Sequence, residues 1–234
     1  MLNNMLIPVS ELVQDYNVKP SGILHVGAHV AEESIEYEKY FNVPVLWIEA
    51  QPKLCLELKK ILNPKSNTIV EACIFDKNDE LLTLNVSSNS QSTSILNFGT
   101  HADVYPDVFV SEKIAVRTKR LDKILEGREI PDFINLDIQG TELNALKSLG
   151  DLINKVQVIY TEVNKRHLYE GCNLVKEMDE YLKIFGFKRI STRWMFRAGW
   201  GDALYVTSKN RSRSFRQFVR SQIRLFKYCI IPPR

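Results

Sequence analysis

The sequence predicts an α/β protein with a doubly wound, mostly parallel β-sheet, and three observations support this prediction. Short apolar runs that end at Gly, Pro or polar residues alternate with stretches of helical spacing along most of the 234 residues. The composition, 44% hydrophobic and 25% charged, is that of an ordinary globular protein with enough apolar residues for one core. Small and acidic residues directly follow several apolar runs, at the positions where such a sheet binds ligands.

Nine apolar runs are predicted to be strands. In chain order they are residues 22–26, 44–48, 68–75, 81–86, 113–118, 132–136, 156–163, 187–191 and 203–207. The runs at 81–86 and 113–118 are less apolar, so we expect those two strands to be less buried.

Amphipathic spacing predicts helices between most of these strands. They are expected at residues 29–41, 52–62, 141–149 and 174–185, with a helical lead-in within residues 1–20. The first helix should bury Ile35 together with Tyr37, and the second should bury Leu58 together with Ile61. Strands that alternate with helices require crossover connections, which are right-handed, so the helices should cover both faces of one sheet. Residues 1–207 are therefore expected to form a single domain.

The C-terminal residues 208–234 differ from the rest of the chain in charge. They contain eight Lys and Arg and no Asp or Glu, so residues 1–207 carry a formal charge of about −5 although the whole chain carries +3. Phe215, Phe218 and Ile223 recur at helical spacing among the basic residues, which predicts a basic amphipathic helix. Such a helix fits an anionic membrane surface, an acidic protein partner or its own domain; nucleic acid is the least favoured partner.

No run approaches the ~20 apolar residues of a membrane span. The first ten residues have no basic start followed by a long apolar run, so no secretory signal is expected. We therefore expect a cytoplasmic protein, peripheral at the inner face of the membrane if the tail binds lipid. The four cysteines (Cys55, Cys73, Cys172 and Cys229) have no metal-binding spacing, and we expect free thiols and no metal.

Two residues at the ends of the first two predicted strands form a nucleoside-binding pattern. Gly27 follows the first strand, where the missing side chain permits a sharp turn and a close approach to a ligand. Glu49 follows the second strand, 22 residues later, and an acid at about this distance reaches the hydroxyls of a ribose. Asp137 and Glu162 end two later strands, which adds two carboxylates at the same edge.

The same stretch argues against a dinucleotide. A pyrophosphate needs the G-x-G-x-x-G pattern and a positive helix start. Here the second and third glycines are absent, and Glu32 and Glu33 stand where the next helix is expected to begin. S-adenosylmethionine (SAM) has a ribose but no phosphate, and its sulfonium and amino group are cations that suit acidic surroundings. SAM is therefore the predicted cofactor.

The segments ILHVGAHVAEE, VLWIEAQP, EACIFD, STSIL, RLDKI, FINLDIQGTELNALKSLG, VIYTEVN, LYEGC and GDALYV resemble, in this order, those of FkbM-type methyltransferases. The similarity runs from about Gly22 to Val206, and DIQGTEL and HVGAHVAEE are its most specific parts. It implies a Rossmann-like, seven-stranded class I methyltransferase fold and O-methylation, often of sugars or other hydroxyl compounds in polysaccharide or natural-product assembly. Many members have Asn at His29, Gly at Ala31 and Glu at Gln139; the change at Ala31 reduces backbone freedom near the methionine end.

The resemblance also implies roles for single residues. Gly27 and Ala28 would line the methionine moiety, and Glu49 would hold the ribose with Ala50 and Gln51 beside it. Ala72 and Cys73 would flank the adenine, and Asp137 would face the methyl group or the amino group. His29, Glu33 and Ile138 complete the set expected to bind the cofactor.

A hydroxyl acceptor needs a base to take its proton. The candidates are Asp137, Glu162, His29 and His167, and Asp137 and Glu162 should converge because they follow neighbouring strands. The acceptor, a small molecule or a glycan, is expected to meet residues 87–94, 165–172 and 192–201. The Ser-rich stretch 86–94 is either a disordered loop or a lid. Two other functions stay open: a nicotinamide-dependent oxidoreductase, and a non-catalytic scaffold that docks through the basic tail.

Overall fold

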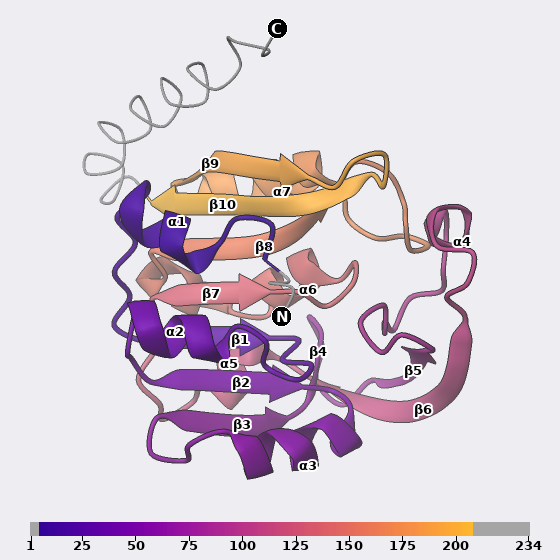
Figure 1. Ribbon diagram of the computed structural model, residues 1–234, viewed down its shortest axis with the longest axis horizontal. Coiled ribbons are helices and arrows are strands. Elements are labelled where there is room, and N and C mark those ends of the chain that lie inside the picture. The colour runs from indigo at the N-terminus through magenta and orange to yellow at the C-terminus, as the bar shows by residue number, and fades with distance from the viewer. Residues whose placement is uncertain (1–4, 208–234) are drawn as a thin grey trace, which may run out of the picture.

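A computed structural model describes residues 5–207, which contain one large sheet, one small sheet and the helices around them (Figure 1). The strands of the large sheet are, in spatial order, β3 (Asn67–Glu71), β2 (Val45–Glu49), β1 (Ile23–Val26), β7 (Phe133–Leu136), β8 (Val158–Asn164), β10 (Trp200–Thr207) and β9 (Phe187–Trp194). The pairs from β3 to β8 are parallel, whereas β10 is antiparallel to both of its neighbours. The prediction of a doubly wound, mostly parallel sheet is confirmed, and the sheet is mixed because of β10.

Helices cover both faces of this sheet, as the alternation of strands and helices predicted. They are α1 (Val9–Gln14), α2 (Ser34–Tyr40), α3 (Pro52–Ile61), α5 (Leu121–Ile124), α6 (Glu142–Lys147), the 3-10 helix η1 (Gly150–Lys155) and α7 (Val175–Ile184). Side chains of β1 alternate between the two faces. Ile23 packs in the cluster that contains Leu12 of α1, Tyr37 of α2 and Leu58 of α3. Leu24 packs in the cluster that contains residues of α6 and α7.

The chain between β3 and β7 forms a second, smaller sheet of the order β4-β6-β5. Its elements are β4 (Cys73–Ile74), β5 (Leu81–Ser87), the short helix α4 (His101–Val104) and β6 (Val110–Lys119). They lie beside the carboxyl ends of the parallel strands (Figure 1). The predicted strands at 81–86 and 113–118 are confirmed. The predicted strand at 68–75 is corrected: it breaks at Ala72, because β3 pairs with β2 whereas β4 leaves the large sheet to pair with β6.

The predicted helix at 29–41 begins five residues later than expected, at Ser34. His29 and Ala31 have φ angles of +45° and +56°, which an α-helix cannot contain. Ile35 is 61% exposed and Ile61 is 63% exposed, so the two burial predictions for these residues are wrong. Fully buried Cys55 packs in α3 in place of Ile61.

Three short helical segments were not predicted from the sequence. The elements α4, α5 and η1 have only four to six residues, too few for a periodic pattern. The helical lead-in predicted within residues 1–20 is present as α1. No helix in residues 5–207 has the length and hydropathy of a membrane span. The basic helix predicted for 208–234 lies outside the described residues.

Candidate active site

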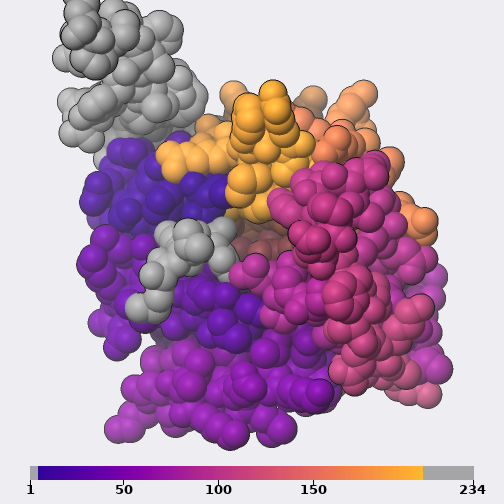
Figure 2. Space-filling view, turned by 45° about the vertical axis from the view of Figure 1, so that its right-hand side comes forward, coloured from indigo at the N-terminus to yellow at the C-terminus, as the bar shows by residue number. Residues whose placement is uncertain are grey.

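A cavity of about 270 Å³ lies at the carboxyl ends of β1, β2, β7 and β8. Its other walls come from the start of β10, from residues 89–95 and from Met5 near the N-terminus. Figure 2 shows the insertion that carries residues 89–95, drawn in magenta, beside the β9–β10 hairpin, drawn in yellow. This is the edge of the sheet where the rule for open α/β sheets places a ligand.

Gly27 lets the ends of β1 and β7 approach each other. Its φ angle is +89°, and a Cβ atom at this position would lie 1.8 Å from the carbonyl oxygen of Asp137. The backbone N–H groups of Gly27 and Ala28 both donate to the carbonyl of Ile48. The glycine turn therefore fixes three strand ends against one another at the floor of the cavity.

Glu49 is held by the backbone that follows the first two strands. One carboxylate oxygen accepts the N–H of His29 at 2.8 Å, and the other accepts the N–H of Gln51 at 2.8 Å. The side chain is 6% exposed, and burial raises its pKa although these hydrogen bonds oppose the shift. The backbone N–H of Ala50 also interacts with this carboxylate. A carboxylate has about four acceptor positions, so Glu49 keeps capacity for a ribose hydroxyl.

Gln139 joins the carboxylates at the ends of β7 and β8. Its side-chain nitrogen donates to Asp137 at 2.5 Å and to Glu162 at 3.1 Å. The hydroxyl of Tyr169 donates to its side-chain oxygen at 2.6 Å, which fixes the orientation of the amide. Burial raises the pKa of Asp137 and raises that of Glu162 well above its usual range, and in Glu162 the charge of Asp137 adds to the effect. Two converging carboxyl groups with raised pKa values can share and accept protons near neutral pH.

Glu142, in the first turn of α6, shapes the loop that carries these groups. Its carboxylate accepts the backbone N–H groups of Ile138 and Gly140 at 3.0–3.1 Å. Gly140 has a φ angle of +107°, and a Cβ atom there would lie 2.8 Å from the Cβ of Cys172. The DIQGTE segment is therefore a loop folded onto its own glutamate.

The cavity is acidic. Its lining includes the carboxyl groups of Glu32, Glu33, Glu49, Asp137, Glu162 and Asp202. No Lys or Arg belongs to the lining among residues 5–207. Burial and the charge of Glu32 raise the pKa of Glu33 to about 8, and burial raises that of Asp202 to about 7. A bound cation would stabilise the ionised forms of these groups, whereas a phosphate would find no Lys or Arg on the described wall.

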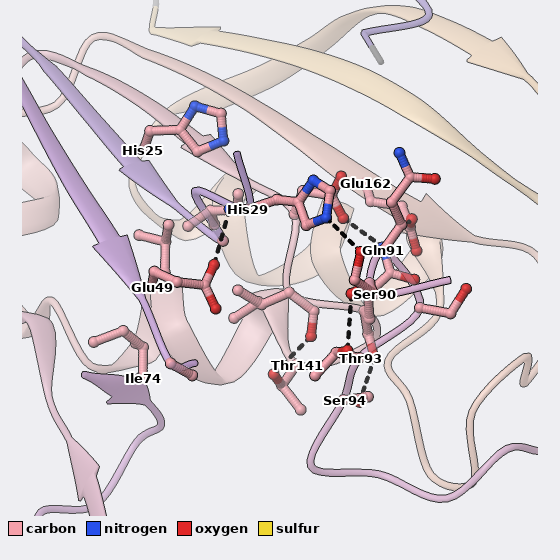
Figure 3. A pocket seen from close by; sticks show the side chains of 18 of the residues that line it. His25, His29, Glu49, Ile74, Ser90, Gln91, Thr93, Ser94, Thr141 and Glu162 are labelled. Carbon is pink, nitrogen blue, oxygen red and sulfur yellow. Dashed lines mark hydrogen bonds between the residues drawn. The ribbon is translucent and has the colours of Figure 1, made fainter. Parts of the chain in front are cut away.

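The Ser-rich stretch forms an ordered wall of the cavity. Of the two alternatives that the sequence left open, a disordered loop and a lid, the structure therefore disagrees with the disordered loop. The backbones of Asn85 and Ser94 exchange hydrogen bonds, and Asn89 bonds to Ser87 and Ser92 within the loop. Ser90 reaches across to His29, at 2.7 Å from Oγ to Nε2 (Figure 3).

His29 is bonded through both ring nitrogens. Its Nδ1 lies 2.8 Å from a carboxylate oxygen of Glu32, which can only accept. Its Nε2 faces Ser90, whose hydroxyl proton is already directed to the carbonyl of Asn89. Burial alone would lower the pKa of His29, but the hydrogen bond and charge of Glu32 outweigh it and raise the pKa. The geometry therefore matches a doubly protonated ring.

Most of the residues predicted from sequence line the cavity. They are Gly27, His29, Glu33, Glu49, Ala50, Gln51, Ala72, Cys73, Asp137, Ile138 and Glu162. Ala28 and His167 do not belong to the lining. Ala28 is buried under the turn, and His167 is exposed with its Nδ1 bonded to the carbonyl of Cys172, so the structure does not bring either to the site.

Ser90 and Trp200 lie in the stretches 87–94 and 192–201, where the sequence predicted contacts with the acceptor, and both line the cavity. Sequence reasoning gave no role to Tyr105, Gln139 and Asp202, which also line it. These three come from the insertion, from a loop and from the antiparallel strand, where no strand-end rule applies. For Gln139 a signal existed, because it lies between Asp137 and Gly140 in the DIQGTEL segment.

Comparison with known proteins agrees with this geometry. Residues 25–189 match the family model described as the methyltransferase FkbM domain. A 2-O-methyltransferase, NoeI of Sinorhizobium fredii, is 35% identical over 82 residues, which span 34% of each chain. Two solved structures of magnesium protoporphyrin IX methyltransferase from Synechocystis PCC 6803, one with bound SAM and one with bound S-adenosylhomocysteine (SAH), give TM-scores of 0.51 and 0.50. They are 13% and 12% identical, and each match covers 86% of this chain, with 76% and 80% of the other chain.

The large sheet with its antiparallel β10 is thus the class I methyltransferase fold. Since the family model covers more than half of the chain, the protein belongs to the FkbM family of SAM-dependent methyltransferases.

Proposed function

We propose that this protein transfers the methyl group of SAM to a hydroxyl group of a sugar or a related small compound. The observation that carries the proposal is the acidic cavity, in which Glu49 keeps acceptor capacity for a ribose hydroxyl and no Lys or Arg lines the described wall. The partial match to a 2-O-methyltransferase supports a hydroxyl acceptor.

The residues present fit SAM better than a dinucleotide. Glu49 would bind the ribose hydroxyls, with Ala50 and Gln51 beside it. Gly27 leaves the floor of the cavity open for the methionine part, and the buried carboxyl of Glu33 and the more exposed carboxyl of Asp137 would face its cationic groups. Ala72, Cys73 and Ile138 offer small and apolar surfaces for the adenine. The same carboxyls would repel a pyrophosphate, which argues against nicotinamide chemistry.

Bound SAM supplies an activated methyl group, and the protein has to align the acceptor and accept its proton. We assign the proton-accepting role to the pair Asp137 and Glu162. Gln139 gives one N–H to each carboxylate and so holds the pair together. His29 is a poor base in this arrangement because both of its nitrogens face acceptors.

The proposal predicts that Glu49→Ala weakens SAM binding at least ~100-fold. The ribose would lose its charged acceptor, and the backbone N–H groups of His29 and Gln51 would lose their hydrogen-bond partner. Isothermal titration of the full chain with SAM measures this. Glu71→Ala is the matched control, since Glu71 pairs with Glu49 in the register of β2 and β3 but is exposed and outside the cavity. Unchanged SAM affinity in Glu49→Ala, or tighter binding of NADH than of SAM by the wild type, contradicts the assignment.

A further inference from the structure

The side of the cavity away from Gly27 has an aromatic wall formed by Tyr105 and Trp200. Tyr105 ends the short helix α4 in the insertion, and Trp200 begins β10, 95 positions later in the chain. The indole N–H of Trp200 donates to the phenolic oxygen of Tyr105 at 2.9 Å. Both rings are half-buried and both line the cavity. We call these two residues the aromatic pair.

The aromatic pair is held in place before any ligand binds. Trp200 packs against the cluster of Leu168, Tyr169 and Cys172. The hydrogen bond fixes the direction of the indole and leaves the phenolic proton of Tyr105 free to donate. A rigid aromatic surface with one polar hydrogen at its edge loses little entropy on binding and matches the apolar face and hydroxyl rim of a sugar ring.

The strand register connects the aromatic pair to the carboxylates of the reaction. Trp200 and Asp202 are two residues apart on β10, so their side chains share a face of the sheet. Asp202 lies directly opposite Glu162 on β8, and Trp200 lies opposite Asn164. Glu162 is therefore a diagonal neighbour of Trp200. Two residues in such a diagonal pair lie ~7–8 Å apart, and one sugar ring can span this distance.

Among the described residues, the cavity offers an acceptor no positive charge that is not already paired. Histidines are the remaining candidates among the described lining residues, since none of these is Lys or Arg. Burial lowers the pKa of His25 to about 4 and also lowers that of His101, so both are neutral at pH 7. His29 is already paired with Glu32. A carboxylate or phosphate on the acceptor would stay unpaired beside Glu162 and Asp202, which is costly in a buried site.

We propose that Tyr105 and Trp200 form the acceptor subsite, and that it selects a sugar ring without carboxylate or phosphate groups over its anionic counterpart. The inference rests on the proposed function and adds the substrate class to it. The acceptor ring stacks on Trp200, receives a hydrogen bond from Tyr105, and turns one hydroxyl toward the Asp137–Glu162 pair.

Binding to the full chain saturated with SAH tests the proposal without requiring turnover. The probes are methyl glycosides of glucose, galactose, mannose, fucose and rhamnose, together with the methyl glycosides of glucuronic and galacturonic acid. Saturation-transfer NMR identifies binders, and titration gives their Kd. We expect at least one neutral glycoside to bind, and each uronic acid to bind at least ~10-fold more weakly than its neutral counterpart.

Three variants locate the subsite. Trp200→Leu should weaken the neutral glycoside ~10-fold, whereas Trp200→Phe should restore part of the loss because it keeps a ring. Tyr105→Phe should weaken it about threefold. Phe196→Leu is the matched control, since Phe196 lies in the same hairpin, is 81% exposed and is outside the lining. With an acceptor that turns over, Trp200→Leu should raise its KM while kcat and the Kd of SAM change less than about threefold.

The outcomes separate this inference from the proposed function. If SAM binds but no neutral glycoside does, if uronic acids bind equally well, or if Trp200→Leu and Trp200→Phe bind glycosides as the wild type does, the acceptor subsite is refuted and the cofactor assignment stands. If SAM itself does not bind, both fail. A thermal melt of each variant shows whether Trp200→Leu is folded, and Trp200→Phe carries the test if it is not.

Discussion

The two sides of the cavity are built in different ways. The side proposed for the cofactor is formed by residues that directly follow parallel strands, such as Gly27 after β1 and Glu49 at the end of β2. The side proposed for the acceptor is formed by the insertion between β5 and β6 and by the antiparallel strand β10, which contribute Ser90, Tyr105 and Trp200. Sheet topology alone places the first side, whereas tertiary contacts between distant segments place the second.

This difference predicts where a substitution does damage. Residues of the cofactor side are fixed by the backbone of the large sheet, so their replacement should disturb both binding and folding. Residues of the acceptor side act through side-chain contacts, so their replacement should change kinetics or affinity in a folded protein. Four predictions test this contrast.

Gly27→Ala should have the largest effect. A Cβ atom would lie 1.8 Å from the carbonyl oxygen of Asp137, on a backbone with a φ angle of +89°. The strand ends would have to separate, so we expect a loss on the order of 3 kcal/mol or more in the free energy of unfolding and no detectable SAM binding. Urea denaturation and titration with SAM measure the two effects.

Gly127→Ala is the control for Gly27→Ala. Gly127 also has a positive φ angle, +72°, but a Cβ atom there would meet nothing within 4 Å. It should lose only about 1 kcal/mol, the cost of the left-handed backbone alone, and should bind SAM normally. Equal losses in the two variants would show that the close approach of β1 and β7 is not what Gly27 provides.

Gln139 connects the two sides, since it bonds to Asp137 and Glu162 and also to Tyr169. Gln139→Leu should lower kcat ~30-fold and change the KM of SAM less, because the carboxylate pair loses its bridge while Glu49 is untouched. The amide lowers the pKa of Asp137, so without it the acidic limb of the kcat profile should move to higher pH. Tyr169→Phe removes only the hydroxyl that orients the amide and should lower kcat a few-fold. A Gln139→Leu enzyme with normal kcat and pH profile would refute the bridge.

The buried carboxyls make a prediction for pH. Glu33, with a pKa of about 8, and Asp202, with a pKa of about 7, keep protons in the folded protein that the unfolded chain has already released. Unfolding then releases protons, so the free energy of unfolding should fall as pH rises, on the order of 3 kcal/mol between pH 6.5 and 9. The raised pKa of His29 acts in the same direction, because its contribution is lost as pH rises through that pKa.

Ligand binding gives the matched comparison for this pH effect. SAM carries a sulfonium that SAH lacks, so the ratio of SAM to SAH affinity should rise over the same pH range as the carboxyls ionise. Melting curves without ligand, with SAM and with SAH at each pH measure both effects. A Tm without ligand that rises from pH 6.5 to 9 would contradict the raised pKa values of Glu33 and Asp202. A constant ratio of SAM affinity to SAH affinity would show that these carboxyls are not the cation site.

The contrast between the two sides also explains what could be predicted from the sequence. Apolar runs and helical spacing located all seven strands of the large sheet, and the strand-end rule found Glu49 and Glu162. The helix expected at 29–41 was misplaced at its start because the positive φ angle of His29 follows from its contact with Glu49, which no local pattern records. Tyr105 could not be connected to Trp200, since only the folded chain brings positions 95 residues apart into hydrogen-bond distance.

The contact of Ser90 with His29 should have the smallest effect, because it is one hydrogen bond between the loop and the turn after β1. Ser90→Ala also removes the bond from Ser90 to the carbonyl of Asn89, but it leaves the side-chain bonds of Asn89 in place. The loop should therefore stay folded, and SAM should dissociate about threefold faster. Ser88→Ala is the control, since Ser88 lies in the same loop but outside the lining. Because the Ser90 hydroxyl is directed to the carbonyl of Asn89, the bond needs a proton on the imidazole Nε2, and the raised pKa of His29 favours that proton. The wild type should therefore lose its advantage over Ser90→Ala as pH rises through that pKa. A difference between the two that grows with pH would show that the bond does not depend on the imidazolium proton. Equal dissociation rates at every pH would show that the loop is held by the bonds within it.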